Sequence, residues 1–169
     1  MKTIIVTGTP CTGKSTLSKK LVKYLQRLQV KLLDVNLIIN KHGLKWSYEK
    51  SRDTYIIDTK KLNKILIDYI TKEKKAKTAY LIIDSHLSHY LPSKYVNLCI
   101  ITTCNLKKLQ SRLRKRNYGL AKVRENLDAE IFEIIYHEAK QLHSKLVKID
   151  TTKGINLNTL KKIKKHITG

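Results

Sequence analysis

The stretch GTPCTGKST, residues 8–16, combines residue types and a spacing that can bind phosphate. It matches the pattern G-x-x-x-x-G-K-[ST], in which successive backbone N–H groups and the start of a helix point at phosphate oxygens. Lys14 would supply a positive charge at the β- and γ-phosphates, and the Ser15 hydroxyl would be a ligand for Mg²⁺. The alternative is a glycine-rich turn that carries a lysine by chance. The motif predicts an ATP site whose nucleotide contacts come from Cys11, Thr12, Gly13, Lys14, Ser15 and Thr16.

Cys11 is the unusual residue of this loop, because many such loops have glycine there. The pattern itself allows any residue at this position. A left-handed backbone would cost a residue with a side chain roughly 1 kcal/mol or more, so we expect an ordinary conformation with the amide facing phosphate. A thiol beside a helix N-terminus and a lysine should react readily when the site is empty, and MgATP should protect it.

A carboxylate is expected near the loop to hold the metal, and the apolar run YLIIDSH supplies Asp84 at the end of a strand. Mg²⁺ in such sites is held largely through water, so Asp84 and Ser15 are the predicted metal residues. His86 could position a water or bond to a phosphate, or it could be structural. A transition-metal cluster of Asp84, His86 and His89 is a weaker alternative, because no further ligands lie nearby in the sequence.

The segment SRLRKRNYGLAKVREN, residues 111–126, is rich in cations. Arg112 and Arg116 are four residues apart and so share a helix face. Phosphoryl transfer spreads negative charge over oxygens that positioned cations stabilise, so a basic lid closing over ATP would suit this chemistry. A solvated basic face is the alternative. The predicted catalytic residues are Lys14, Asp84, His86, Arg112 and Arg116.

Strands and helices alternate along the chain. Apolar, β-branched runs predict strands at 3–8, 30–35, 79–84, 96–103 and 145–150. Helical spacing predicts helices at 14–28, 58–75, 105–119, 124–143 and 156–167, of which 124–143 is the longest. The candidate N-caps are Asp58 or Thr59 for the second of these helices and Asn105 for the third. Residues 36–58 are expected to be irregular. This order predicts an α/β fold, a three-layer α/β/α sandwich around about five parallel strands, in one domain spanning residues 1–169.

Positive charge dominates the composition, with 35 Lys and Arg residues against 13 Asp and Glu, a formal net charge of +22. Such a surface attracts RNA, nucleotides or acidic proteins, although a lysine-rich coding bias would give the same count. The three cysteines have no paired spacing, which argues against a disulfide framework and a zinc site. No run approaches the length of a membrane span, so we expect a cytoplasmic protein without membrane contact.

The combination of G-T-P-x-T-G-K-S-T, IIDSH and R-x-Y…K…EN…AEIF…EA resembles the adenylate kinase isoenzyme 6 family, the small nuclear or archaeal kinase-like ATPases of ribosome assembly. The match runs through nearly the whole chain. The resemblance implies a P-loop kinase that transfers phosphate from ATP to AMP, with ATPase activity. It also implies a monophosphate-binding insertion near residues 31–54 and a short lid near 115–125. Arg116 would contact ATP, and Lys153 would lie near the adenine.

The resemblance also implies partners, namely a small-subunit ribosomal protein of the S11 group and, through rRNA maturation, pre-ribosomal RNA. A monomer or weak oligomer is expected. The sequence departs from the family at Cys11 and Asn117, where the family has glycine, and in a segment 41–55 that is less acidic than expected. Arg52 is the candidate contact for the monophosphate. A kinase for another small metabolite, or an assembly ATPase with negligible AMP kinase activity, remains an alternative.

Overall fold

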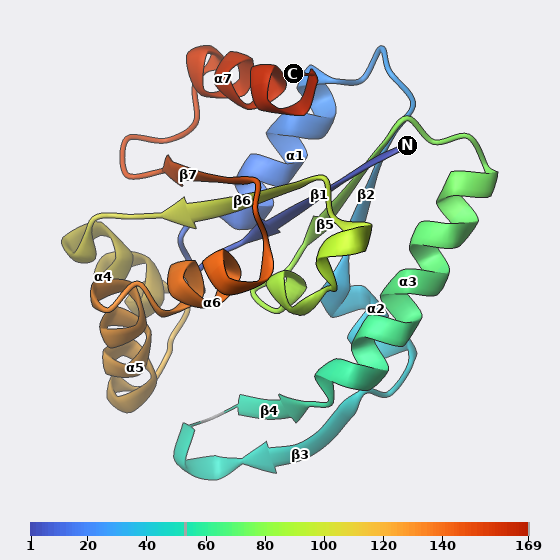
Figure 1. The fold of residues 1–169 in the computed structure, drawn as a ribbon. Helices are drawn as coiled ribbons and strands as arrows, with labels where there is room; N and C mark the ends of the chain where they lie inside the picture. Colours follow the sequence, from blue (N-terminus) through green and yellow to red (C-terminus); the bar gives the residue numbers. More distant parts are fainter. Residues whose placement is uncertain (53, 169) are drawn as a thin grey trace.

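A parallel β-sheet forms the centre of the computed structural model, which describes residues 1–52 and 54–168, with the side chain of Arg52 excluded (Figure 1). The strand order is β2-β5-β1-β6-β7. These strands span Lys2–Thr7 (β1), Val30–Asp34 (β2), Tyr80–Asp84 (β5), Leu98–Thr103 (β6) and Leu146–Asp150 (β7). The prediction of about five parallel strands is confirmed.

Helices cover both faces of the sheet, because its central strands are apolar on both sides. On β1, Ile4 and Val6 pack against α1 (Lys14–Tyr24) and α7 (Leu157–Thr168), whereas Ile5 faces α2 (Val35–Lys41) and α3 (Thr59–Lys75). Figure 1 shows α1 and α7 together on one side and α3 on the other. The result is the predicted three-layer α/β/α sandwich.

The carboxyl ends of the five strands meet at one edge, since the strands are parallel and in register. Val6 of β1 and Asp34 of β2 both pair with Asp84 of β5, and Thr103 of β6 pairs with Asp150 of β7. The connections reverse direction beside β1, and ligands of open α/β sheets bind at such a point. The fold therefore places the loop after β1 and the end of β5 side by side.

The structure differs from the prediction that residues 36–58 are irregular. The Asp34 side chain accepts a hydrogen bond from Asn36 N at 2.9 Å and starts α2. An antiparallel hairpin of β3 (Lys45–Glu49) and β4 (Thr54–Ile57) follows, with the short helix η1 (Lys50–Arg52) between its strands. The hairpin is stabilised by the cross-strand pair of Tyr48 and Tyr55, whose ring centroids are 5.1 Å apart. Its strands contain no apolar run from which the sequence could have predicted them.

The helix predicted over 124–143 is two helices, α5 (Leu120–Ile131) and α6 (Ile134–Leu142). Glu133 between them is left-handed, with φ 47°. The two helices separate because they pack on different partners, α5 on α4 (Leu106–Lys115) and α6 on the sheet and η2 (Ser88–Tyr90). The longest helix is α3, with 17 residues, and the predicted Asp58 cap accepts hydrogen bonds from the amides of Lys60 and Lys61.

Helix α4 begins at its predicted Asn105 cap but ends at Lys115, before Gly119. The chain turns at Asn117, whose φ is 56°. Asparagine tolerates this left-handed conformation better than most residues, which explains how the chain replaces the family's glycine here. The remaining short helix is η3 (Ser93–Tyr95). Within residues 1–52 and 54–168, no helix has both the length and the apolar character needed to cross a bilayer.

Candidate active site

The glycines of the phosphate-binding loop are required by close packing. Gly8 has φ 136°, and a Cβ there would lie 2.4 Å from the backbone oxygen of Thr102. Gly13, the N-cap of α1, has φ 97°, and its Cβ would lie 3.1 Å from Thr151 Oγ1. Because both positions have positive φ and little space, a side chain at either would distort the loop. The loop thus sits directly on the ends of β6 and β7.

The expectation of an ordinary backbone at Cys11 is wrong, because its φ is 68°. The loop turns back sharply here, and the amide of Thr12 donates to Thr9 O at 3.2 Å. Arg112 Nη1 donates to the Cys11 carbonyl at 3.3 Å and holds it in place. The left-handed conformation costs about 1–2 kcal/mol, which these contacts offset. The thiol is free, partly exposed and in the pocket lining, so its predicted reactivity stays a prediction.

Lys14 lies over the loop that precedes it. Its ammonium donates to Gly8 O at 2.8 Å and to Thr9 O at 2.9 Å. Burial lowers the pKa of Lys14 from 10.5 to about 8, although the nearby Asp84 and Cys11 act in the opposite direction. A lysine held by carbonyls at the start of a helix is well placed to meet phosphate oxygens.

Asp84 ends β5 beside this lysine and is buried. Burial raises the pKa of Asp84, while a hydrogen bond from the Ser15 hydroxyl and the charge of Lys14 lower it. A carboxylate and a hydroxyl in contact are hard oxygen donors, the kind that Mg²⁺ prefers. The pair Ser15 and Asp84 therefore fits a magnesium ion.

The two histidines after β5 have different surroundings. His86 is exposed to solvent within the pocket. Desolvation of its ring against the cleft, followed by the charges of Lys14 and His89, lowers the pKa of His86 to about 4, so the ring is neutral at pH 7. His89 is buried, and its ring nitrogens contact Thr7 Oγ1 and Glu138 Oε2, each at 3.0 Å. Burial lowers the pKa of His89.

These contacts weigh against the transition-metal alternative. Both ring nitrogens of His89 already have protein partners, so the ring links β1 to α6. Across the described part of the chain, no three His, Cys, Asp or Glu side chains are grouped closely enough to hold a metal.

The basic residues of α4 and the following turn have two different placements. Arg112 donates from Nη2 to Thr151 O at 3.1 Å and from Nη1 to the Cys11 carbonyl, so it braces the loop against the end of β7. Arg116 is exposed and lies at the pocket, as does Lys122, whose ammonium is 4.7 Å from the ring centroid of Tyr118. The cations at the predicted lid therefore face the loop.

One cavity of about 580 Å³ brings most of the predicted residues together. Its lining includes Cys11, Gly13, Lys14, Ser15, Thr16, Asp84, His86, Arg112 and Arg116. Two predicted residues do not line it. The Thr12 side chain is buried against Thr102, at 2.7 Å between the hydroxyl oxygens, and Lys153 is exposed beside Gly154 at the rim.

The cavity also contains residues that the sequence did not single out: Asn36, Thr54, Ser85, Tyr118 and Thr151. Thr151 and Ser85 each directly follow a strand of the parallel sheet, and this position was the available signal. Nothing local marks Asn36 or Thr54, which tertiary packing brings to the site from the region predicted to bind the monophosphate. The side chain of Arg52, the candidate in that region, lies outside the described residues.

Comparisons with known proteins agree with this geometry. The AAA domain family matches residues 4–133. A Methanocaldococcus jannaschii protein with an adenylate kinase name is 40% identical over 149 residues, which are 88% of this chain and 76% of that protein. The adenylate kinase isoenzyme 6 homologue of Candida albicans is 33% identical over 144 residues, 81% of this chain and 56% of its own.

Similarity extends to a solved structure. A Chloroflexus aurantiacus protein with a kinase name, whose crystal structure is known, is 21% identical and has a TM-score of 0.54. The alignment covers 99% of this chain and 96% of that one, so the likeness holds for the fold as a whole.

Proposed function

Because the chain belongs to the adenylate kinase isoenzyme 6 family, we propose that it transfers the γ-phosphoryl group of ATP to AMP. The observation that carries this proposal is the single cavity that holds Lys14 and Asp84 together with the cations Arg116 and Lys122. Phosphoryl transfer depends mainly on positioning and on positive charge around the moving group, and this cavity supplies both.

The residues divide the work of the reaction. The loop amides and Lys14 bind the β- and γ-phosphates, and Ser15 and Asp84 would hold Mg²⁺. When bound, the metal neutralises charge on the phosphate oxygens. Arg116 approaches from the lid side and stabilises the charge that spreads over the transferred group. Arg112 keeps the loop in shape through the Cys11 carbonyl.

The acceptor would bind on the side of the cavity formed by residues 31–54. Asn36 from α2 and Thr54 from β4 reach the lining there and offer hydrogen bonds to a monophosphate. His86, which is exposed and neutral at pH 7, would orient a water, and the protein would then hydrolyse ATP slowly when no acceptor is present.

A steady-state assay tests the proposal. ADP should form from ATP and Mg²⁺ when AMP is added, and Lys14→Ala should abolish it. Each nucleoside monophosphate is assayed in parallel. Absence of AMP-dependent ADP formation would reject the proposal, and transfer to another acceptor would indicate a different metabolite kinase. ATP hydrolysis that AMP does not change would indicate an assembly ATPase.

A role in small-subunit ribosome assembly is a second proposal, supported by the distribution of charge and aromatic surface. The net charge is +22, and α7 exposes its lysines while Ile163 and Ile167 are buried. On the β3–β4 hairpin, Trp46 and Tyr55 are 74% and 49% exposed, with lysine ammonium groups near both rings. Exposed aromatics among cations suit single-stranded RNA, whose bases stack on such rings.

Binding of single-stranded rRNA fragments at moderate salt tests this second proposal. Trp46→Ala should weaken RNA binding by roughly 1–3 kcal/mol, the typical value for one stacked base, and leave ATP binding unchanged. Equal RNA affinity of the two proteins would reject the hairpin as the contact. The resemblance implies a ribosomal protein of the S11 group as well, and its binding is measured in the same way.

A further inference from the structure

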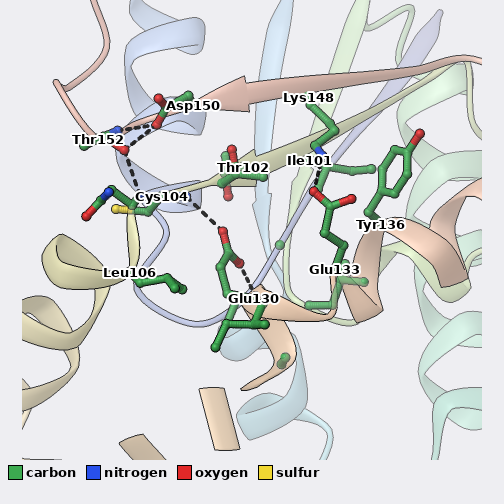
Figure 2. A pocket seen from close by; sticks show the side chains of 17 residues that line it. Ile101, Thr102, Cys104, Leu106, Glu130, Glu133, Tyr136, Lys148, Asp150 and Thr152 are labelled. Atoms are coloured by element: carbon green, nitrogen blue, oxygen red, sulfur yellow. Dashed lines mark hydrogen bonds and ion pairs between the residues drawn. The ribbon is translucent and has the colours of Figure 1, made fainter. Parts of the chain in front are cut away.

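A second cavity, of about 550 Å³, lies behind the phosphate-binding loop, between the ends of β6 and β7 and the junction of α5 and α6 (Figure 2). Its acidic residues already have protein partners. Glu133 pairs with Lys148, and Asp150 Oδ1 accepts from Thr152 N at 2.8 Å. The third acid of the cavity, Glu130, points at the loop (Figure 2).

Glu130 joins three separate segments through one carboxylate. It lies in the last turn of α5, half-buried. Its Oε2 accepts from Thr9 Oγ1 at 2.6 Å, and its Oε1 accepts from Cys104 N at 2.9 Å. Thr9 is buried within the phosphate-binding loop, and Cys104 directly follows β6. Charge-assisted bonds of this kind are short and strong, so the carboxylate fixes the loop relative to the sheet.

Thr9 is also the residue that holds Lys14. Its carbonyl accepts from Lys14 Nζ at 2.9 Å and from Thr12 Oγ1 at 2.7 Å. Glu130 therefore contacts the side chain of the residue whose backbone orients the lysine. We propose that Glu130 is a positioning residue of the nucleotide site, which fixes Thr9 and thereby the ammonium of Lys14 for contact with ATP phosphates.

The test rests on ATP binding, the part of the proposed function that needs no acceptor. Affinity for a fluorescent ATP analogue with Mg²⁺ is measured at neutral pH for wild type, Glu130→Gln, Glu133→Gln, Lys14→Met and the double variant with Lys14→Met and Glu130→Gln. The control removes an acid of the same cavity that does not touch the loop. Melting temperatures are recorded for each protein.

Glu130→Gln should bind roughly tenfold more weakly, the loss expected for a hydrogen bond to a charged group. In the Lys14→Met background the same change should have no further effect on affinity, because the ammonium that Glu130 positions is already gone, and Glu133→Gln should match wild type. A merely structural role would weaken binding by the same factor in both backgrounds. An equal loss in both backgrounds, or wild-type affinity in a folded Glu130→Gln, would overturn the proposal.

Failure of the proposed function gives a different result. A wild-type protein that binds ATP, and loses affinity on Glu130→Gln only when Lys14 is present, but transfers nothing to AMP would reject the AMP kinase and leave the role of Glu130 supported. A wild-type protein that binds no ATP would overturn both.

Discussion

Replacement of Lys14 by methionine should make the stability of the protein less dependent on pH. Burial lowers the pKa of Lys14 from 10.5 to about 8 in the folded protein. A pKa difference of one corresponds to 1.36 kcal/mol, so keeping the ammonium charged in the loop destabilises the folded protein by about 3 kcal/mol. A methionine carries no such charge.

The sign follows from proton binding. Since the folded pKa lies below the unfolded one, the unfolded chain binds more protons between about pH 8 and pH 10.5. The destabilisation is therefore complete below pH 8 and disappears as the pH rises towards 10.5. Between pH 7 and pH 10, the free energy of unfolding of wild type should rise by about 2.5 kcal/mol relative to Lys14→Met.

Urea denaturation of both proteins at several pH values measures this. All other titrating groups are common to the two proteins, so their contributions cancel in the difference. A difference that stays constant from pH 7 to pH 10 would refute the reasoning, because it would mean that the ammonium is solvated and does not rest on the Gly8 and Thr9 carbonyls. Lys14→Met should also abolish ATP turnover. The charged lysine would then be required for activity although it lowers the stability of the folded protein.

Three further outcomes are expected. Gly8→Ala should lower the free energy of unfolding, measured by urea denaturation, by about 3 kcal/mol or more, because its Cβ would lie 2.4 Å from a backbone oxygen of β6. Gly119→Ala is the control and should leave the free energy of unfolding unchanged, because its Cβ would meet nothing within 4 Å. Asp84→Asn should remove Mg²⁺-dependent turnover but keep the fold and part of the nucleotide affinity; normal turnover in a magnesium titration would contradict the metal assignment. Alkylation of Cys11 should inactivate the enzyme, and MgATP should slow the alkylation, because the nucleotide would cover the thiol. The other two cysteines are buried and should react more slowly. Equal labelling of Cys11 with and without MgATP would contradict this prediction.

Local sequence predicted the features that depend on neighbouring residues. The apolar runs predicted all five strands of the sheet, and the motif G-x-x-x-x-G-K-[ST] predicted the loop after the first. Asp84 could be proposed because it ends a buried strand, and parallel strands bring their carboxyl ends to one edge. Asp58 and Asn105 could be named as helix caps because a capping side chain bonds within a few residues of itself.

Local sequence misled where packing against distant segments decided the outcome. The pattern over 124–143 reads as one helix, yet the chain breaks at Glu133 because its two halves pack on different elements. The β3–β4 hairpin is held by cross-strand pairs, which carry no strong pattern along the chain. Cys11 is left-handed where the loop turns back on Thr9 and Arg112 holds its carbonyl, and its neighbours in sequence do not reveal this.

The sequence by itself determined that a parallel α/β sheet carries a phosphate-binding loop, a carboxylate at the end of a neighbouring strand and a basic helix, since each depends on a short stretch of residues. Only the tertiary structure decided that Arg112 braces the loop, that Thr54 and Asn36 reach the cavity, and that Glu130 holds Thr9. These contacts join segments far apart in the chain, and their geometry exists only after the sheet has brought the ends of its strands together.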